Sequence, residues 1–136
     1  MGTIRGVRAE LLPGCTGTGE GYSVPDEGGL LVGRGVECHV HIDCPAVSVR
    51  HCRIFRSDDD EYFIEDTSSN RTYVNGKKLW RGDKLPLKDF DAIKLTKRPH
   101  QELVFTIRIY GSQPVVGRLR FLYLDRFPDR RSSRRS

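Results

Sequence analysis

The sequence predicts an all-β domain, either a sandwich or a barrel built from short strands. Apolar segments recur about every 8–12 residues and are separated by Gly, Pro, Asn and Asp, which is the pattern of such folds. Before residue 115 no segment keeps the 3.6-residue apolar period of an amphipathic helix. A length of 136 residues suits one domain with a single core.

The individual strands are predicted from apolar alternation, or from compact apolar runs, bounded by turn residues. In chain order they cover residues 4–12, 22–24, 30–32, 37–42, 52–56, 62–65, 72–74, 77–79, 91–96 and 103–110. The strongest hairpin signal is Asn75-Gly76, because both residues tolerate the positive φ angles of a type I′ turn. The acidic residues 57–61 are predicted to form the tip of another hairpin.

The C-terminal residues 113–136 are predicted to be an extension of a domain that covers residues 1–112. Residues 115–124 fit either a helix packed on the domain or a strand, and the helix is the preferred interpretation. The last eleven residues contain five arginines: Arg126, Arg130, Arg131, Arg134 and Arg135. This composition predicts a basic, disordered tail, with a nuclear-import or nucleic-acid patch as the alternative.

The overall composition is that of a soluble globular protein. The chain has no apolar run of ~18 residues, so no transmembrane helix is expected. Residues 1–10 contain arginines and no apolar core, so no secretory signal is expected either. The formal net charge of +5 mildly favours anionic partners.

The four cysteines do not predict a metal site. They form no C-x-x-C pair, and only the run from Cys38 to Cys44, with His39 and His41 inside it, has mixed ligand types. On a strand these cysteines and histidines would point to opposite faces. We therefore expect free, buried, reduced cysteines and no bound metal, which also favours an intracellular location.

Three short polar motifs lie where strand patterns give way to turns. They cover residues 33–34, 48–51 and 66–76. An arginine in the first motif offers a planar fork that matches phosphate oxygens, and serine hydroxyls with loop N–H groups in the others can complete an anion site. Each motif alone is common by chance, but the three together in this order are specific.

In order and spacing these motifs resemble the forkhead-associated (FHA) domain. The matching stretches are residues 31–34, 47–51 and 72–76, and a weaker likeness extends over roughly residues 4–110. The resemblance implies a two-sheet antiparallel β-sandwich of the FHA/SMAD-like type. It also implies that loops at one end of the sandwich bind phosphothreonine peptides.

The resemblance also assigns roles to four residues. Arg34 would clamp the phosphate and Ser48 would hydrogen-bond it. Ser69 would touch the phosphate, and Asn70 would hold the peptide backbone beside the phosphothreonine. The ordinary alternatives are a solvated loop arginine, a local serine turn and a turn-forming asparagine. We expect all four residues to converge at one end of the sandwich.

Two further motif residues are expected to brace loops without touching a ligand, namely His51 and Asn75. A catalytic Ser48–His51 pair is rejected, because the chain shows no nucleophile elbow and no third group to orient the imidazole. Paired catalytic carboxylates, a P-loop and a metal cluster are not evident either. The sequence therefore predicts a protein that is not an enzyme and needs no cofactor.

Three positions depart from the family pattern. Val49 stands where many members carry a polar or basic residue, which should weaken the phosphate site. Arg71 replaces a frequent glycine, so it is strained if its φ is positive, and its charge could hold an acidic peptide. Ala46 replaces an arginine that in some members reads an acidic residue. Arg50 or Lys77 could take over that role.

The leading hypothesis for function is a phosphothreonine-dependent interaction module in signalling, with a link to the DNA damage response. Its partner would be a phosphothreonine protein, and its parent could be longer, such as a checkpoint-type Ser/Thr kinase with an N-terminal FHA domain, or a nuclear FHA adaptor. One alternative is a phosphate-independent pseudo-FHA scaffold. Another, weaker alternative is nucleic-acid binding through the basic tail. A nuclear location is expected, with the cytoplasm as a further possibility, and no membrane partner.

Overall fold

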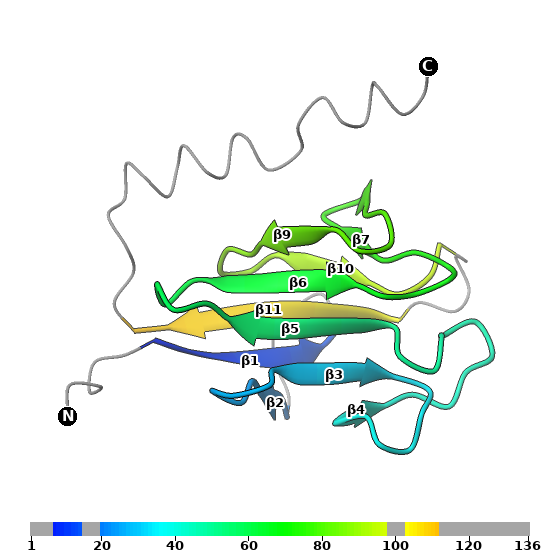
Figure 1. The fold of residues 1–136 in the computed structure, drawn as a ribbon, viewed down its shortest axis with the longest axis horizontal. Helices are drawn as coiled ribbons and strands as arrows, with labels where there is room; N and C mark the ends of the chain where they lie inside the picture. The colour runs from blue at the N-terminus through cyan, green and yellow to red at the C-terminus, as the bar shows by residue number, and fades with distance from the viewer. Residues whose placement is uncertain (1–6, 15–19, 98–102, 112–136) are drawn as a thin grey trace.

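The computed structural model describes residues 7–14, 20–97 and 103–111 (Figure 1). These residues form eleven strands. The strands are β1 (Arg8–Pro13), β2 (Tyr22–Ser23), β3 (Leu30–Gly33), β4 (Val40–His41), β5 (Cys52–Arg56), β6 (Tyr62–Asp66), β7 (Tyr73–Val74), β8 (Lys77–Lys78), β9 (Lys84–Pro86), β10 (Ala92–Lys94) and β11 (Val104–Tyr110). No helix occurs within the described residues.

The strands are arranged in two sheets that pack face to face. One sheet has the order β2-β1-β11-β10-β7-β8, and the other has the order β4-β3-β5-β6-β9. Neighbouring strands pair in antiparallel fashion except β3 and β4, which are parallel. The predicted all-β sandwich is confirmed, and the choice between sandwich and barrel is settled in favour of the sandwich.

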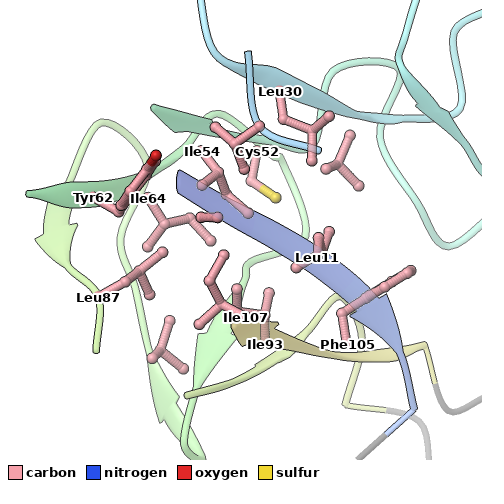
Figure 2. Packing of buried hydrophobic residues seen from close by; sticks show 14 of the residues in the cluster. Leu11, Leu30, Cys52, Ile54, Tyr62, Ile64, Leu87, Ile93, Phe105 and Ile107 are labelled. Carbon is pink, nitrogen blue, oxygen red and sulfur yellow. The ribbon is translucent and has the colours of Figure 1, made fainter. Parts of the chain in front are cut away.

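The core lies between the two sheets and is filled by alternate residues of the central strands. In β6, for example, Tyr62 and Ile64 are buried while Phe63 is half-buried. Figure 2 shows Ile64 from one sheet and Ile107 from the other among the clustered apolar side chains. Each fully buried aliphatic side chain of this kind contributes ~1.5–3 kcal/mol, so the core holds the two sheets together.

One predicted strand is shorter in the structure, and one observed strand was not predicted. The strand expected over residues 37–42 is reduced to β4, because the chain turns first, with the Cys38 N–H bonded to the Gly35 carbonyl at 3.1 Å. Strand β9 was missed, because its single buried residue, Leu85, gives no alternation and Pro86 argues against a strand. It lies at the edge of its sheet, where proline is tolerated.

Both predicted hairpins are confirmed. Asn75 and Gly76 have φ angles of 51° and 83°, as a type I′ turn between β7 and β8 requires. The acidic tip joins β5 to β6, and the Ser57 N–H donates to the Glu61 carbonyl at 2.7 Å. These turns fix the register of the strands that lead to the loops described below.

The remaining predictions concern the ends of the chain and its cysteines. Residues 4–6, the segment 115–124, the arginine-rich tail and Cys15 lie outside the described residues, as does the boundary at residue 112. Cys38, Cys44 and Cys52 carry no disulfide. Within the described part of the chain no group of three or more His, Cys, Asp or Glu could share a metal, and no helix could span a membrane.

Candidate anion-binding site

Three loops meet at one end of the sandwich. They join β3 to β4, β4 to β5 and β6 to β7, and Figure 1 shows them at the end opposite the β5–β6 hairpin. The first two loops are linked by the Arg34 side chain, whose Nε donates to the Val47 carbonyl at 2.8 Å. The second and third are linked by the Ser69 N–H, which donates to Ser48 Oγ at 3.0 Å. The four predicted site residues therefore lie on adjoining loops.

Arg34 presents an exposed guanidinium with a fixed orientation. Its backbone N–H donates to the Ser48 carbonyl at 2.9 Å, and its Nε is held by Val47 as described. Among the described residues, its two terminal nitrogens have no hydrogen-bond or ion-pair partner. A guanidinium held by Nε, with both terminal N–H groups exposed, is suited to a paired contact with phosphate oxygens.

Gly33 allows the chain to place Arg34 in this way. It is buried against the β4–β5 loop, where the Gly35 N–H donates to the Val49 carbonyl at 3.0 Å. A Cβ atom on Gly33 would overlap the same carbonyl oxygen. Glycine is therefore required by the close approach of two backbones, a steric reason for the Gly-Arg motif that the sequence alone did not show.

Ser48 and Ser69 form a pair of hydroxyls beside Arg34. Their Oγ atoms are 3.3 Å apart, and Ser48 Oγ also accepts the Ser69 N–H. The Ser48 hydroxyl thus joins two loops through a bond between residues 21 positions apart, and it does not form the local turn considered as its ordinary alternative. Because its oxygen already accepts a bond, its proton is available to an anion.

Asn70 lies at the outer edge of the same group. Its Nδ2 donates to the Ala46 carbonyl at 2.8 Å, which ties the β6–β7 loop to the β4–β5 loop. Its Oδ1 has no partner among the described residues and the side chain is exposed. The amide can therefore accept from a peptide N–H while its nitrogen stays anchored.

His51 braces the loops of the site through hydrogen bonds to their backbones, as expected. The ring is 0% exposed. Its Nδ1 accepts the Ser48 N–H at 3.1 Å, so its Nε2 carries the proton and donates to the Arg71 carbonyl at 3.0 Å. Burial lowers the pKa of His51, which keeps it neutral in this role. Both ring nitrogens are occupied by backbone groups, so His51 is not a base for the Ser48 hydroxyl.

Asp66 organises the β6–β7 loop and was missed by the sequence analysis. It is fully buried, and its Oδ1 accepts three bonds, from Ser68 N at 3.0 Å, Ser68 Oγ at 2.6 Å and Thr72 Oγ1 at 2.9 Å. The Ser68 Oγ in turn accepts the Arg71 N–H at 2.7 Å. An aspartate two residues before a serine is an Asx-turn pattern, and that was the available signal.

Arg71 has a positive φ angle, which confirms the strain anticipated for an arginine in place of glycine. Its φ is 100°, a region that costs a non-glycine residue ~1–3 kcal/mol. Hydrogen bonds to Ser68 in the same loop and from His51 in the β4–β5 loop hold its backbone in this conformation. Its guanidinium carbon lies 5.1 Å from the centre of the Trp80 ring, a cation–π contact that offsets part of this cost.

The other motif residues have structural roles or are exposed. Asn75 braces the β7–β8 hairpin, since its Nδ2 donates to Asp91 Oδ1 and its Oδ1 accepts the Ala92 N–H, both at 2.9 Å. Val49 is 47% exposed beside the site and offers no polar group. Arg50 is paired with Glu37 at 3.2 Å on the surface. The hairpin-bracing role predicted for Asn75 is confirmed, whereas the effect of Val49 on phosphate binding stays a prediction.

Comparison with protein families and curated proteins points to one family. The family model described as "FHA domain" matches residues 30–96. The chain is 35% identical over 68 residues to the human proliferation marker protein Ki-67. It is 33% identical over 79 residues to the probable serine/threonine-protein kinase fhkA of Dictyostelium discoideum. The chain spans only 2% and 13% of the lengths of these two relatives.

Comparison with solved structures gives the same family. The MEK1 FHA domain, solved in complex with a HOP1 phosphothreonine peptide, is 25% identical with a TM-score of 0.62, covering 74% of this chain and 95% of that one. The N-terminal FHA domain of Rad53 from S. cerevisiae is 20% identical with a TM-score of 0.65, covering 76% and 94%, and supports the fold alone. Residues 30–96 of this chain therefore match the forkhead-associated (FHA) domain in sequence, and the fold around them matches solved FHA domains.

Proposed function

We propose that this domain is a non-catalytic module that binds phosphothreonine on partner proteins in phosphorylation-dependent signalling. The observation that carries the proposal is the exposed Arg34 fork next to the Ser48–Ser69 hydroxyl pair. The fork has no partner at its terminal nitrogens within the described residues, and the hydroxyls are held by hydrogen bonds between loops. A dianionic phosphate is the ligand that satisfies both groups at once.

The proposed mechanism uses a site that is already formed. Arg34 contributes two parallel N–H bonds to phosphate oxygens, and the Ser48 O–H donates to a third oxygen. Ser69 adds a second hydroxyl, and Asn70 Oδ1 accepts a backbone N–H of the peptide. Because Nε of Arg34 and Nδ2 of Asn70 are already anchored, little side-chain order is lost on binding.

Neighbouring structures favour phosphothreonine over other anions. The MEK1 domain, at 25% identity, was solved with a phosphothreonine peptide. A second structure, at 26% identity and a TM-score of 0.60, is described as an analysis of phosphothreonine-dependent FHA domain interactions. What those proteins bind supports, by similarity, a phosphothreonine peptide as the ligand here.

We further propose that the domain works within a longer nuclear signalling protein, such as one of the DNA damage response. Two of the relatives are probable kinases, of which this chain spans 13%, so catalysis would reside elsewhere in such a parent. The five arginines of residues 126–136 and the free cysteines favour an intracellular, nuclear location. A fluorescent fusion with and without residues 127–136 tests it, and a purely cytoplasmic signal for both would contradict it.

One observation favours a second candidate function, a phosphate-independent scaffold. Val49 exposes nearly half of its apolar surface beside the site, where a polar group would strengthen phosphate binding. Titration of one peptide in phosphorylated and unphosphorylated forms separates the two functions. Equal affinity for both forms would favour the scaffold.

The decisive test measures, by calorimetry, the affinity of the domain for a phosphothreonine peptide selected from an oriented library. Hydrogen bonds to charged groups contribute ~1.5–3 kcal/mol each, so Arg34→Ala should weaken binding by about tenfold to a few hundredfold. Ser48→Ala should cost less, and Arg34→Lys should lie between wild type and Arg34→Ala because it loses the fork. A glutamate peptide should not bind.

The matched control is Arg8→Ala, which removes one positive charge from the start of β1, at the other end of the sandwich (Figure 1). It should leave the affinity within about twofold of wild type, apart from weak long-range charge effects. Thermal melting of each variant checks that the fold is intact. If Arg34→Ala binds the phosphopeptide like wild type, the phosphate site lies elsewhere.

A further inference from the structure

The residue that follows Asn70 has a fixed backbone at the edge of the site. The Arg71 N–H donates to Ser68 Oγ at 2.7 Å, and the Arg71 carbonyl accepts the His51 Nε2–H at 3.0 Å. Its φ of 100° is one that few arginines adopt. The Arg71 side chain therefore leaves the backbone from a defined point, one residue beyond the amide proposed to hold the peptide.

That side chain lies against an aromatic ring that a second cation also contacts. The Arg71 guanidinium carbon is 5.1 Å from the centre of the Trp80 ring, and Lys78 Nζ is 4.7 Å from the same centre. The ring itself lies on an anchored turn, since the Trp80 N–H donates to Asp83 Oδ2 and the Asp83 N–H donates to the Trp80 carbonyl, both at 2.8 Å. Two positive charges thus lie within about 5 Å of the centre of one anchored ring.

These two cations have no carboxylate partner among the described residues, in contrast to most arginines of the fold. Arg8, Arg50, Arg53, Arg56 and Arg108 each form an ion pair. Arg71 forms none, and its Nε is buried without a hydrogen-bond partner in the described part of the chain. Its two terminal nitrogens are not buried in this way and have no hydrogen-bond or ion-pair partner among the described residues, so they can bind an anionic ligand.

We propose that Arg71 and Lys78, supported by the Trp80 ring, form a second anion subsite next to the phosphothreonine site. The inference rests on the proposed function and extends it. The ligand is then a phosphothreonine segment with a second negative group a few residues away. That group is a carboxylate of Asp or Glu, or a second phosphate, because both offer oxygens for a guanidinium.

The test uses an alanine-rich peptide with one phosphothreonine, in which a single glutamate is moved one position at a time along either side. For wild type, a glutamate at one position or at either of two adjacent positions should make the peptide bind about 1.5- to fivefold more tightly than the alanine parent, the range expected of an exposed ion pair. Phosphoserine at that position should bind more tightly still. In Arg71→Gln the affinity of the best glutamate peptide divided by that of the alanine parent, called the affinity ratio below, should fall to about one.

Control variants separate charge at this subsite from net charge and from folding. Arg8→Gln removes the same charge at the far end of the sandwich and should keep the wild-type ratio. Lys78→Gln should reduce the ratio in part. Arg71→Gly also removes the charge, and glycine suits the φ of 100°, so it repeats the test if Arg71→Gln folds poorly.

The outcomes for this inference and for the proposed function are distinct. If no phosphothreonine peptide binds, the proposed function fails. If the peptides bind but glutamate and phosphoserine give no gain at any position, the second subsite is wrong. A gain that persists in both Arg71 variants would also overturn it. A gain with phosphoserine alone would identify the second group as a phosphate, and a gain with glutamate too would admit an acidic side chain.

Discussion

Replacing His51 by alanine should unfold the two loops that it joins. The change removes the bond from the Ser48 N–H and the bond to the Arg71 carbonyl, and it leaves a cavity where a fully buried ring stood. Two neutral hydrogen bonds contribute ~2 kcal/mol together, and the cavity adds at least ~1 kcal/mol. We therefore expect His51→Ala to lower the free energy of unfolding by about 3 kcal/mol.

Urea denaturation well above pH ~6.5 measures this loss with the imidazole neutral. The matched control is His41→Ala, because His41 is exposed on β4 and should change stability little. The same variants should be titrated with phosphopeptide, since His51→Ala frees both the Ser48 and the Arg71 loops. A loss of less than about 1 kcal/mol would show that the loops hold their shape without the histidine, and the bracing argument would be wrong.

The same histidine predicts a dependence of stability on pH. Burial lowers the pKa of His51 below its unfolded value of about 6.5, so the folded state favours the neutral ring. Its contribution to stability is thus fully present above that pH and is lost as the pH falls toward the folded pKa, at up to ~1.4 kcal/mol per pH unit. His51→Gln should lack this component. A wild-type minus variant difference that is flat between neutral and mildly acidic pH would contradict the assignment.

Three other changes test the geometry around the site. Gly33→Ala should destabilise the domain by at least ~1–3 kcal/mol and weaken phosphopeptide binding, because the new Cβ overlaps the Val49 carbonyl; wild-type melting and affinity would contradict this. Cys52 is fully buried, and this burial raises the pKa of its thiol. Cys52 should therefore react with a disulfide reagent only after denaturant is added. A rapid reaction of Cys52 in buffer would show that the core opens. Arg71→Gly should be as stable as wild type, or up to about 1 kcal/mol more stable, in a denaturation experiment. The reason is that relief of ~1–3 kcal/mol of backbone strain exceeds the loss of the contact with Trp80. A clear loss of stability would show that the arginine is not strained.

The sequence was sufficient to predict the fold class and which loops form the site, for physical reasons that can be named. Strands such as β5 were predicted with correct bounds because alternation and turn residues are local signals. The Asn75-Gly76 hairpin was predicted because few other pairs tolerate two positive φ angles. The four candidate residues were placed on adjoining loops because each motif follows a strand whose end lies at the same edge of the sandwich.

What the sequence did not predict depends on contacts between distant segments. The three bonds to Asp66 Oδ1 involve residues of one loop, but their importance depends on burial, which a local pattern does not reveal. The need for Gly33 arises from Val49, 16 residues later, through a close approach of two backbones. The contact between Arg71 and Trp80 depends on how the turn after β8 folds back, and no spacing rule predicts that.

Arg71 has two roles that its backbone and its side chain perform separately. The backbone belongs to the proposed phosphothreonine site, because its carbonyl orients His51, which in turn holds the Ser48 N–H. The side chain extends away to Trp80 and leaves Nε without a partner in the described residues. Glycine at this position would keep the first role without strain, so the energetic cost of arginine has to be offset by the side chain. The contact with the Trp80 ring offsets only part of the strain energy, so stability of the fold alone does not explain an arginine at this φ. Binding of a ligand that carries a second anion explains it better.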